Sequence, residues 1–339
     1  MDLHSVWFLL VAVLIAGYAV LDGFDLGVGV LHLFARSEDE RRVHLQAVGP
    51  VWDGNEVWLL TGGGALFAAF PAVYATVFSG FYLALMLLLF ALILRAVSIE
   101  FRGQLAAPRW RRAFDWGFGV GSLLPAVLLG VAVGNILRGV PIAVDGSYTG
   151  TFLGLLSPYA VLVGLCSLAF FVLHGALYLH MKADGEQGAR MGRLALRLWV
   201  AWLVLYLGAT AATAVVSPHL FAGLAACPVF WPFAVLLAAA TVTVPLALRG
   251  GRERLAFVAS STTIVAMIGI AGVSLYPRLV PSLTDLAYSL TIDNAASTPR
   301  TQTVMLVIAL VGMPIVLAYT VLIHRAFRGR IKPSEGGHY

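Results

Sequence analysis

The sequence predicts an all-α fold that lies in a membrane as one integral domain over residues 1–339. Of these residues, 60% are hydrophobic and only 12% are charged, and the mean hydropathy is +0.89. Such a composition is too apolar for a water-soluble protein of this length. The apolar residues also gather in long segments with mostly short polar connections. We therefore expect a polytopic bundle of transmembrane helices.

Nine segments are long and apolar enough to cross the hydrocarbon core of a bilayer, which requires about 20 helical residues. In chain order they cover residues 6–34, 49–70, 72–98, 114–137, 156–181, 193–216, 228–249, 255–276 and 301–326. The fifth and the ninth follow longer connections, over residues 138–157 and 277–300, that mix turn residues with apolar ones. We expect these two connections to pack on the outer surface and against a partner.

The basic residues predict the orientation of the chain. All but three of the 22 Lys and Arg residues lie on flanks that fall on one side of the nine segments, and the exceptions are Arg138, Arg278 and Arg300. Lys and Arg concentrate in cytoplasmic loops, so we expect the N-terminus outside and the C-terminus in the cytoplasm. The same distribution accounts for the net charge of +5 and argues against nucleic-acid binding.

Two pairs of glycines lie inside these segments at a spacing of four residues. They are Gly23 with Gly27 and Gly117 with Gly121. Glycines at this spacing let two helix backbones approach closely. Ordinary packing within the chain is the simplest interpretation of both pairs, and the glycine run at 62–64 either packs in the same way or marks a bend.

Four carboxylates lie inside the first two segments: Asp22 and Asp25 in the first, and Asp53 and Glu56 in the second. At about 1.5 Å of rise per residue, all four fall in the half nearer the cytoplasm, at a depth comparable with that of Arg95. Each pair is spaced i, i+3, which places its two side chains on one helix face. We expect Arg95 to be the cationic partner of at least one acid.

Asn55 adds hydrogen-bond donors beside these acids, and Trp52 adds an aromatic wall. Ionisable groups inside a membrane are expensive and by default mark an ion or proton path. Burial and neighbouring charges would also give the acids different proton affinities. The alternative interpretation is a satisfied buried network that only fixes the register of the helices. The residue pattern leaves both interpretations open.

His174 is the histidine that lies clearly within a predicted segment. A haem needs axial His, Met or Cys ligands that face a buried cavity, but a lone histidine in a span more often hydrogen-bonds to its neighbours. His174 and His180 are six residues apart and share no helix face, which argues against a two-histidine metal site. Cys166 and Cys227 suggest neither a disulfide nor a thiolate site. We expect no haem and no metal on ligands of this chain.

Several motifs carry a resemblance to a known family. The acidic motifs read GYAVLDGFDLGVG at 17–29 and PVWDGNEVWLLTGGGALFAAFP at 50–71. Later motifs read DWGFGVGSLLPAVLLGVAVGN at 115–135 and TPRTQTVMLVIALVGMPIVLAY at 298–319. Together they resemble subunit II of the cytochrome bd-type quinol oxidases, from the first segment to the last.

The resemblance implies a heterodimeric respiratory oxidase of the bacterial inner membrane that oxidises quinol and reduces dioxygen to water. In that family subunit I binds haems b and d and the quinol-oxidising site. Subunit II has nine helices, described as two four-helix bundles plus one peripheral helix. This chain would then be a non-haem subunit that is not catalytic alone. The family also allows a small single-span subunit and a structural quinone, which the sequence does not place.

The family's acidic, aromatic and arginine positions correspond here to Asp25, Trp52, Asp53 and Arg95. Asp53 and Asp25 would line a cytoplasmic proton path toward the haem site at the subunit interface, and Asp22 follows them in rank. Glu56 ranks last, because related chains can carry a neutral Gln in that motif.

Two other hypotheses remain beside a proton-guiding subunit. One is a purely structural subunit for assembly of the complex. The other is a secondary transporter that uses the acids for proton coupling. Against the transporter, the two halves of the sequence show no matched pair of interrupted helices, which is the usual pointer to such a site.

Overall fold

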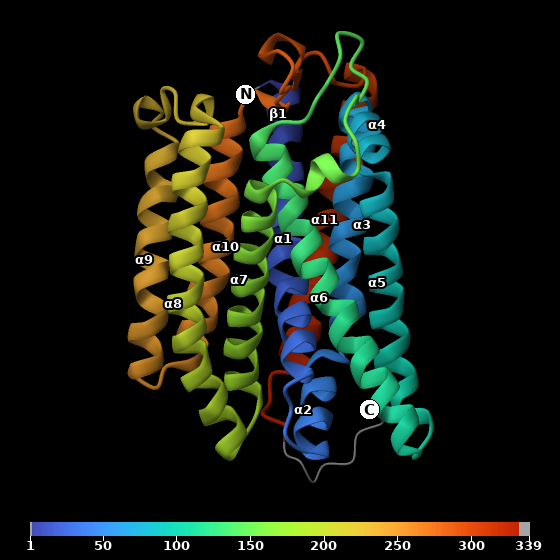
Figure 1. The fold of residues 1–339 in the computed structure, drawn as a ribbon, viewed down its shortest axis with the longest axis vertical. Coiled ribbons are helices and arrows are strands. Elements are labelled where there is room, and N and C mark those ends of the chain that lie inside the picture. Colours follow the sequence, from blue (N-terminus) through green and yellow to red (C-terminus); the bar gives the residue numbers. More distant parts are fainter. Residues whose placement is uncertain (1, 332–339) are drawn as a thin grey trace.

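The computed structural model describes residues 2–331, and its long helices run along the longest axis of the molecule (Figure 1). In that part of the chain the α-helices are α1 (Leu3–His32), α2 (Glu38–Val48), α3 (Trp52–Ala69), α4 (Pro71–Gly80), α5 (Tyr82–Phe101), α6 (Pro108–Arg138), α7 (Pro158–Lys182), α8 (Gly185–Val216), α9 (Phe230–Arg249), α10 (Glu253–Leu275) and α11 (Pro299–Ala326). Short 3-10 turns lie at Arg102–Gln104, Leu153–Leu156, Pro218–Leu220, Leu224–Ala226 and Leu286–Tyr288.

The prediction of an all-α polytopic membrane protein is confirmed. Within residues 2–331, eight helices are long and apolar enough to cross a membrane, namely α1 and α5 to α11. Helix α3 has 18 residues, but Asp53 and other polar residues in its first turns lower its hydropathy. Helix α3 corresponds to the second predicted segment, 49–70, and is not among the eight candidate spans. The count of nine spans therefore stays a prediction.

The structure divides the predicted helix over 72–98 into α4 and α5. The backbone leaves helical geometry at Phe81, with φ −97° and ψ 13°. At the neighbouring Gly80 an added Cβ would lie 2.6 Å from the ring of Tyr148, which belongs to the connection before α7. This contact with a distant loop coincides with the break. With 10 residues, α4 is too short to span a bilayer.

Helix α2 was not predicted, since residues 35–48 read as a polar connection. The side chain of Ser37 accepts a hydrogen bond from the backbone N–H of Glu40 at 3.2 Å and caps the helix. Acidic residues fill the first turn, where they interact favourably with the helix dipole. Val43, Leu45 and Val48 are buried, so the second half of the helix packs against the rest of the protein.

Helix α7 lies between two groups of helices. It packs against α8 and α10 on one side and against α1 and α6 on the other, while α9 packs on α10. In Figure 1, α7 to α10 lie on the left and α1, α3, α5 and α6 lie on the right. Helix α11 contacts α3 and α1, and the most apolar stretch of α11 has no buried residue.

The largest apolar cluster joins α1 to α7 and α10. The ring of Phe24 on α1 stacks on that of Tyr178 with centroids 4.0 Å apart, and it meets Phe257 edge-on at 5.8 Å. Phe24 lies between Asp22 and Asp25 in the sequence. The aromatic core therefore holds the turn of α1 that carries both acids.

Both glycine pairs lie at close helix contacts, as predicted. A Cβ at Gly27 would lie 1.8 Å from the carbonyl oxygen of Phe171, so α1 and α7 touch through their backbones. A Cβ at Gly121 would lie 2.7 Å from the carbonyl oxygen of Ala91, which brings α6 equally close to α5. Helix α3 continues through the glycine run at 62–64 without a break.

We expect Gly27→Ala to lower the free energy of unfolding by about 3 kcal/mol, because the new methyl group meets backbone that cannot rotate away. The thermal midpoint of the purified protein measures this effect. Gly63→Ala is the matched control, since a Cβ at Gly63 has nothing within 4 Å. Equal midpoints for the two variants would contradict a backbone contact between α1 and α7.

The two long connections pair with each other at one end of the molecule. The strands β1 (Arg278–Val280) and β2 (Leu290–Thr291) are antiparallel, with Arg278 opposite Thr291. The backbone N–H of Val140 donates to Pro281 at 3.0 Å, and that of Leu283 donates to Val140 at 3.0 Å. The two connections thus pack together at one end of the molecule, which we call the loop end, while their position outside the membrane and against a partner stays a prediction.

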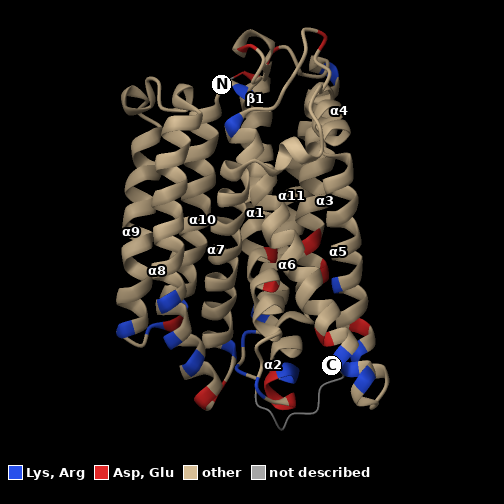
Figure 2. Ribbon diagram, viewed as in Figure 1, with Lys and Arg blue, Asp and Glu red and all other residues tan. Residues whose placement is uncertain are grey.

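Lys and Arg residues gather at the opposite end, around α2 (Figure 2). We call it the basic end. Arg278 lies in β1 and Arg300 begins α11, so both lie at the loop end. Arg138, the last residue of α6, lies two residues before Val140, which pairs with Ser282 just beyond β1. The folded chain thus keeps the separation of charge that the sequence predicted.

Candidate functional site

A buried ion pair joins α5 to α1 and extends to α3. The guanidinium of Arg95 donates from Nη2 to Asp22 Oδ1 at 2.7 Å, and both side chains are fully buried. The same nitrogen lies 3.4 Å from Oε2 of Glu56, whose side chain is 20% exposed. The prediction that Arg95 partners at least one acid is confirmed. We call Asp22, Glu56 and Arg95 the Arg95 cluster.

Close helix packing positions Arg95. A Cβ at Gly121 would lie 2.7 Å from the backbone nitrogen of Arg95, so α6 presses directly on this turn of α5. Tyr18, one turn before Asp22 on α1, is also buried and interacts electrostatically with both Asp22 and Arg95. The sequence analysis did not include Tyr18, although its i, i+4 spacing from Asp22 would have indicated it.

Asp25 belongs to a second contact, one turn along α1. Asn55 donates from Nδ2 to Asp25 Oδ2 at 2.8 Å and to the carbonyl oxygen of Leu21 at 3.1 Å. Asp25 and Asn55 are both almost fully buried. In the described part of the chain, no arginine or lysine lies within ion-pair distance of Asp25. Asn55 therefore orients this carboxylate without balancing its charge.

Asp53 and Trp52 lie apart from these contacts. Asp53 is exposed in the first turn of α3, and among residues 2–331 it makes no hydrogen bond or ion pair. Trp52 packs against the large apolar cluster as a half-buried side chain. Asp53 and Glu56 were predicted to share a helix face, but they differ in burial. Glu56 is half-buried and reaches Arg95, whereas Asp53 stays exposed.

A small cavity lies beside Asn55, between α3 and α11. Its volume is about 10 Å³, and its lining includes Gly54, Tyr319 and His324. A cavity of this size holds about one water molecule. His324 donates a hydrogen bond from Nδ1 to the carbonyl oxygen of Thr320, 2.9 Å away. The cavity places polar groups of α11 next to Asn55, a contact that the sequence did not predict.

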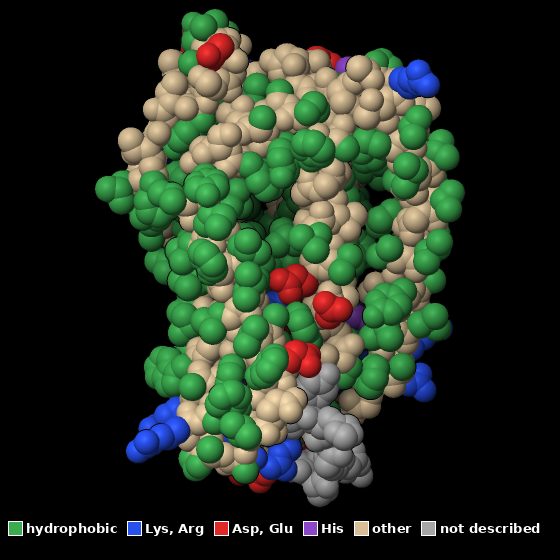
Figure 3. Space-filling model, turned by 90° about the vertical axis from the view of Figure 1, so that its right-hand side faces the viewer, with side chains coloured by type: hydrophobic (Ala, Val, Ile, Leu, Met, Phe, Trp, Pro, Cys, Tyr) green, Lys and Arg blue, Asp and Glu red, His purple; other side chains and the backbone are tan. Residues whose placement is uncertain are grey.

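Apolar side chains surround the acids on the outer face of α3, α5 and α11. Figure 3 shows acidic side chains in red within this largely green face. The exposed apolar residues there include Val57, Leu60, Phe90, Leu94, Ile315 and Leu322. Asp53 and part of Glu56 thus open onto a surface suited to lipid or to another membrane protein.

His174 does not fit a haem ligand in this fold. Its Nδ1 lies 2.7 Å from Oγ of Ser260, and its Nε2 lies 3.1 Å from the carbonyl oxygen of Val20. Its ring stacks on Phe257 with centroids 4.7 Å apart. Both ring nitrogens are therefore engaged by protein. Within residues 2–331, no group of three or more His, Cys, Asp and Glu side chains is arranged to hold a metal ion.

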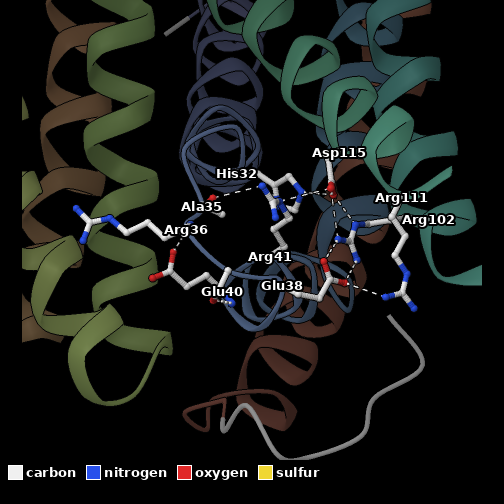
Figure 4. A network of polar contacts seen from close by, with 10 residues as sticks. His32, Ala35, Arg36, Glu38, Glu40, Arg41, Arg102, Arg111 and Asp115 are labelled. Atoms are coloured by element: carbon white, nitrogen blue, oxygen red, sulfur yellow. Dashed lines mark hydrogen bonds and ion pairs between the residues drawn. The ribbon is translucent and has the colours of Figure 1, made fainter. Parts of the chain in front are cut away.

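A second polar network at the basic end was missed by the sequence analysis (Figure 4). The Nε2 atom of buried His32 lies 2.7 Å from Asp115, and Arg102 donates to the same carboxylate at 2.5 Å. Arg102 also donates to both carboxylate oxygens of Glu38, at 3.1 and 2.9 Å. These residues lie at segment ends, where charge was interpreted only as a marker of topology.

His44 on α2 lies under this network. Its ring centroid is 5.7 Å from that of His32. Burial lowers the pKa of His44 well below its ordinary value, and the charges of Arg190 and Arg41 act in the same direction. His44 is therefore neutral at physiological pH.

The chain is similar to proteins of known family over nearly all its length. Residues 3–327 match the family described as cytochrome bd terminal oxidase subunit II. The chain is 38% identical over 364 residues to cytochrome bd-I ubiquinol oxidase subunit 2 of Escherichia coli strain K12, covering 98% of this chain and 96% of that protein. It is 34% identical to cytochrome bd ubiquinol oxidase subunit 2 of Bacillus subtilis strain 168, with 98% of each chain covered.

The fold is also similar to a solved structure. A chain of the bd oxidase from Geobacillus thermodenitrificans superposes with a TM-score of 0.77 at 19% sequence identity, covering 96% of this chain and 99% of that one. The sequence match and the fold agree with the motifs around Asp22 and Asp53. The chain belongs to the family of cytochrome bd terminal oxidase subunit II.

Proposed function

We propose that this chain is the non-haem second subunit of a bacterial respiratory complex that oxidises quinol and reduces dioxygen to water. The relatives are named as subunits of ubiquinol oxidases, and a second subunit requires a first. In this proposal the partner subunit I carries haems b and d, which accords with the engagement of both His174 nitrogens. This chain contributes a scaffold and a proton path, and it is not catalytic alone.

The proposal places the protein in the inner membrane with the basic end in the cytoplasm. Lys and Arg are retained on the cytoplasmic side during insertion. The N-terminus would then lie outside and the C-terminus inside. We count α3 as a ninth span. The helices then form two sets of four, α1, α3, α5 and α6 beside α7 to α10, with α11 peripheral.

The single observation that carries the proton path is the pair of buried carboxylates on α1. Asp22 and Asp25 are 0% and 1% exposed. Of these two acids, only Asp22 has an arginine partner among residues 2–331. A buried carboxyl group without a counterion is suited to exchange a proton, because its charged form is not stabilised.

The arrangement suggests an order for the path. Asp53 is the exposed acid nearest the start of α3 and would collect protons at the cytoplasmic side. Asn55 lines the small cavity and donates a hydrogen bond to Asp25, so it would connect the two. Asp22 lies one turn before Asp25 on α1 and belongs to the Arg95 cluster. Asp22 and Glu56 would be the next proton carriers of the path. We keep Glu56 last in rank as a proton carrier.

The partner subunit is proposed to cover the face of α3, α5 and α11. A carboxylate that faces lipid inside the membrane is expensive, and Glu56 and Asp53 open onto this face. A protein surface there would enclose the path and receive its protons. The proposal allows a small third subunit and a quinone in the same complex, without residues of this chain assigned to either.

Two alternatives predict different results from the same experiments. A purely structural role is favoured by the Asp22–Arg95 pair, which satisfies a buried charge. Haem absorbance from this chain expressed without a partner would contradict the proposed division between subunits. Proton-coupled solute uptake into vesicles that contain this chain alone would support a transporter.

We expect Asp53→Asn to leave the complex assembled with an unchanged haem spectrum and to slow quinol-driven oxygen uptake by about tenfold. The effect is smaller than that of a buried acid–base group, typically at least 10²-fold, because solvent can deliver protons around an exposed carboxylate. Asp39→Asn is the control, since Asp39 is an exposed acid on α2 at the same end. Normal uptake in Asp53→Asn would remove Asp53 from the path.

A further inference from the structure

A large open cavity lies at the basic end, between the end of α1, the first turns of α2 and the start of α6. Its volume is about 620 Å³, within the usual range of ligand pockets. Its polar lining consists of His32, Glu38, Arg41, Arg109, Arg111, Arg112 and Asp115. Figure 4 shows most of these groups at close range. The cavity lies outside the Arg95 cluster and the proposed proton path.

The acids of the cavity are already neutralised. Buried Arg102 lies behind the lining and binds both Asp115 and Glu38. Arg41 lies a further 3.5 Å from Asp115, and Arg111 lies 3.4 Å from Glu38. The two carboxylates, Glu38 and Asp115, thus pair with three guanidinium groups, so this part of the cavity already carries one excess positive charge.

Arg109 and Arg112 add a surplus of positive charge. Both are exposed on the first turns of α6, and neither makes an ion pair with any residue that the structure describes. The start of α6 also directs free backbone N–H groups toward this region, which favours an anion. His32 also lines the cavity, and its Nε2 atom lies 2.7 Å from Asp115. The cavity therefore fits a phosphate-type anion.

Aromatic and apolar side chains beside the cavity are of the kinds found where a protein meets a membrane surface. Trp116 lines the cavity and is 60% exposed, and tryptophan favours the boundary between lipid and water. Leu33 forms part of the wall. Nearby Phe101 and Leu105 are half exposed, and a continuous apolar surface follows α5 into the membrane. A ligand with a phosphate group and acyl chains would meet both surfaces.

We propose that this cavity binds the phosphate headgroup of an anionic phospholipid from the leaflet at the basic end. Arg109 and Arg112 contact the phosphate, Arg41 and Arg111 line its sides, and the acyl chains lie against α5 beside Trp116. Basic pockets between transmembrane helices bind such headgroups in other membrane proteins. The site does not depend on proton transfer through Asp25.

The test compares two doubly substituted forms of the intact oxidase complex in detergent. Arg109→Ala with Arg112→Ala removes the unpaired arginines of the cavity. Arg252→Ala with Arg254→Ala is the matched control, because both arginines are exposed at the same end, Arg252 just before α10 and Arg254 in its first turn. Native mass spectrometry during titration with dioctanoyl phosphatidylglycerol measures the affinity, and dioctanoyl phosphatidylcholine is the neutral comparison.

We expect the cavity variant to bind the phosphatidylglycerol roughly 25-fold more weakly, at about fivefold for each arginine, and the control variant to bind like the unaltered complex. Equal losses in the two variants would overturn the site in favour of general charge attraction. Competition by glycerol 3-phosphate at equal concentration would identify a soluble phosphate ligand and overturn the lipid. Truncation after residue 331 should leave the binding undiminished, and loss of binding in that form would contradict the proposal.

Discussion

Arg95→Leu is expected to lower the free energy of unfolding by about 3–5 kcal/mol and to reduce the amount of assembled complex. The substitution leaves Asp22 fully buried without its partner at 2.7 Å, and breaking a buried pair on one side leaves an uncompensated charge. It also removes the attraction to Glu56. The yield of purified complex and its thermal midpoint measure the effect.

A second variant separates the charge effect from the loss of packing. Asp22→Asn, Glu56→Gln and Arg95→Gln together remove all three charges of the Arg95 cluster. Replacing a complete buried set is often nearly neutral, so this triple variant should recover most of the lost stability. Arg254→Leu serves as control, because it removes an exposed arginine. A stable Arg95→Leu complex would show that the ion pair does not hold these helices together.

Asp25→Asn is expected to slow quinol-driven oxygen uptake by about 10²-fold, at the lower limit for loss of a positioned acid–base group. The substitution keeps the size of the side chain and an oxygen that can accept the hydrogen bond from Asn55, now 2.8 Å long. The complex should therefore assemble with an unchanged haem spectrum. Oxygen uptake by the purified complex, with quinol in excess, measures the change.

Asp25→Glu supplies the matched control, because it restores an exchangeable proton at the same place. We expect it to recover a substantial part of the uptake that Asp25→Asn loses. Loss of haem in Asp25→Asn would favour the structural role. Full activity would show that protons reach the partner without this carboxylate.

The predicted architecture depended on features that are local in the sequence. Long apolar runs mark the membrane helices, and Pro71 separates α3 from α4 close to the predicted boundary. The division at Phe81 was not predicted. It coincides with a contact between Gly80 and Tyr148, which are far apart in the chain. Helix α2 was missed because its polar surface resembles that of a connecting segment.

The candidate site was predicted in composition and only in part in geometry. The i, i+3 spacing predicted that Asp22 and Asp25 share a face, and both are buried. The same spacing rule did not predict how deeply Asp53 and Glu56 of α3 are buried within the protein. Asp53 ranked first and is exposed, whereas Glu56 ranked last and reaches Arg95. Spacing describes direction around one helix axis, and contact depends on how that helix is rotated against its neighbours.

The sequence by itself determined that this protein lies in a membrane, which end carries the positive charge, and which acids must be accommodated there. Those properties follow from hydropathy and charge, which act residue by residue. Only the tertiary structure decided that Arg95 pairs with Asp22, that Asn55 holds Asp25, and that the arginines of α6 surround a cavity. Each of these contacts joins separate helices, and close packing at glycines such as Gly121 determines how far their side chains must reach.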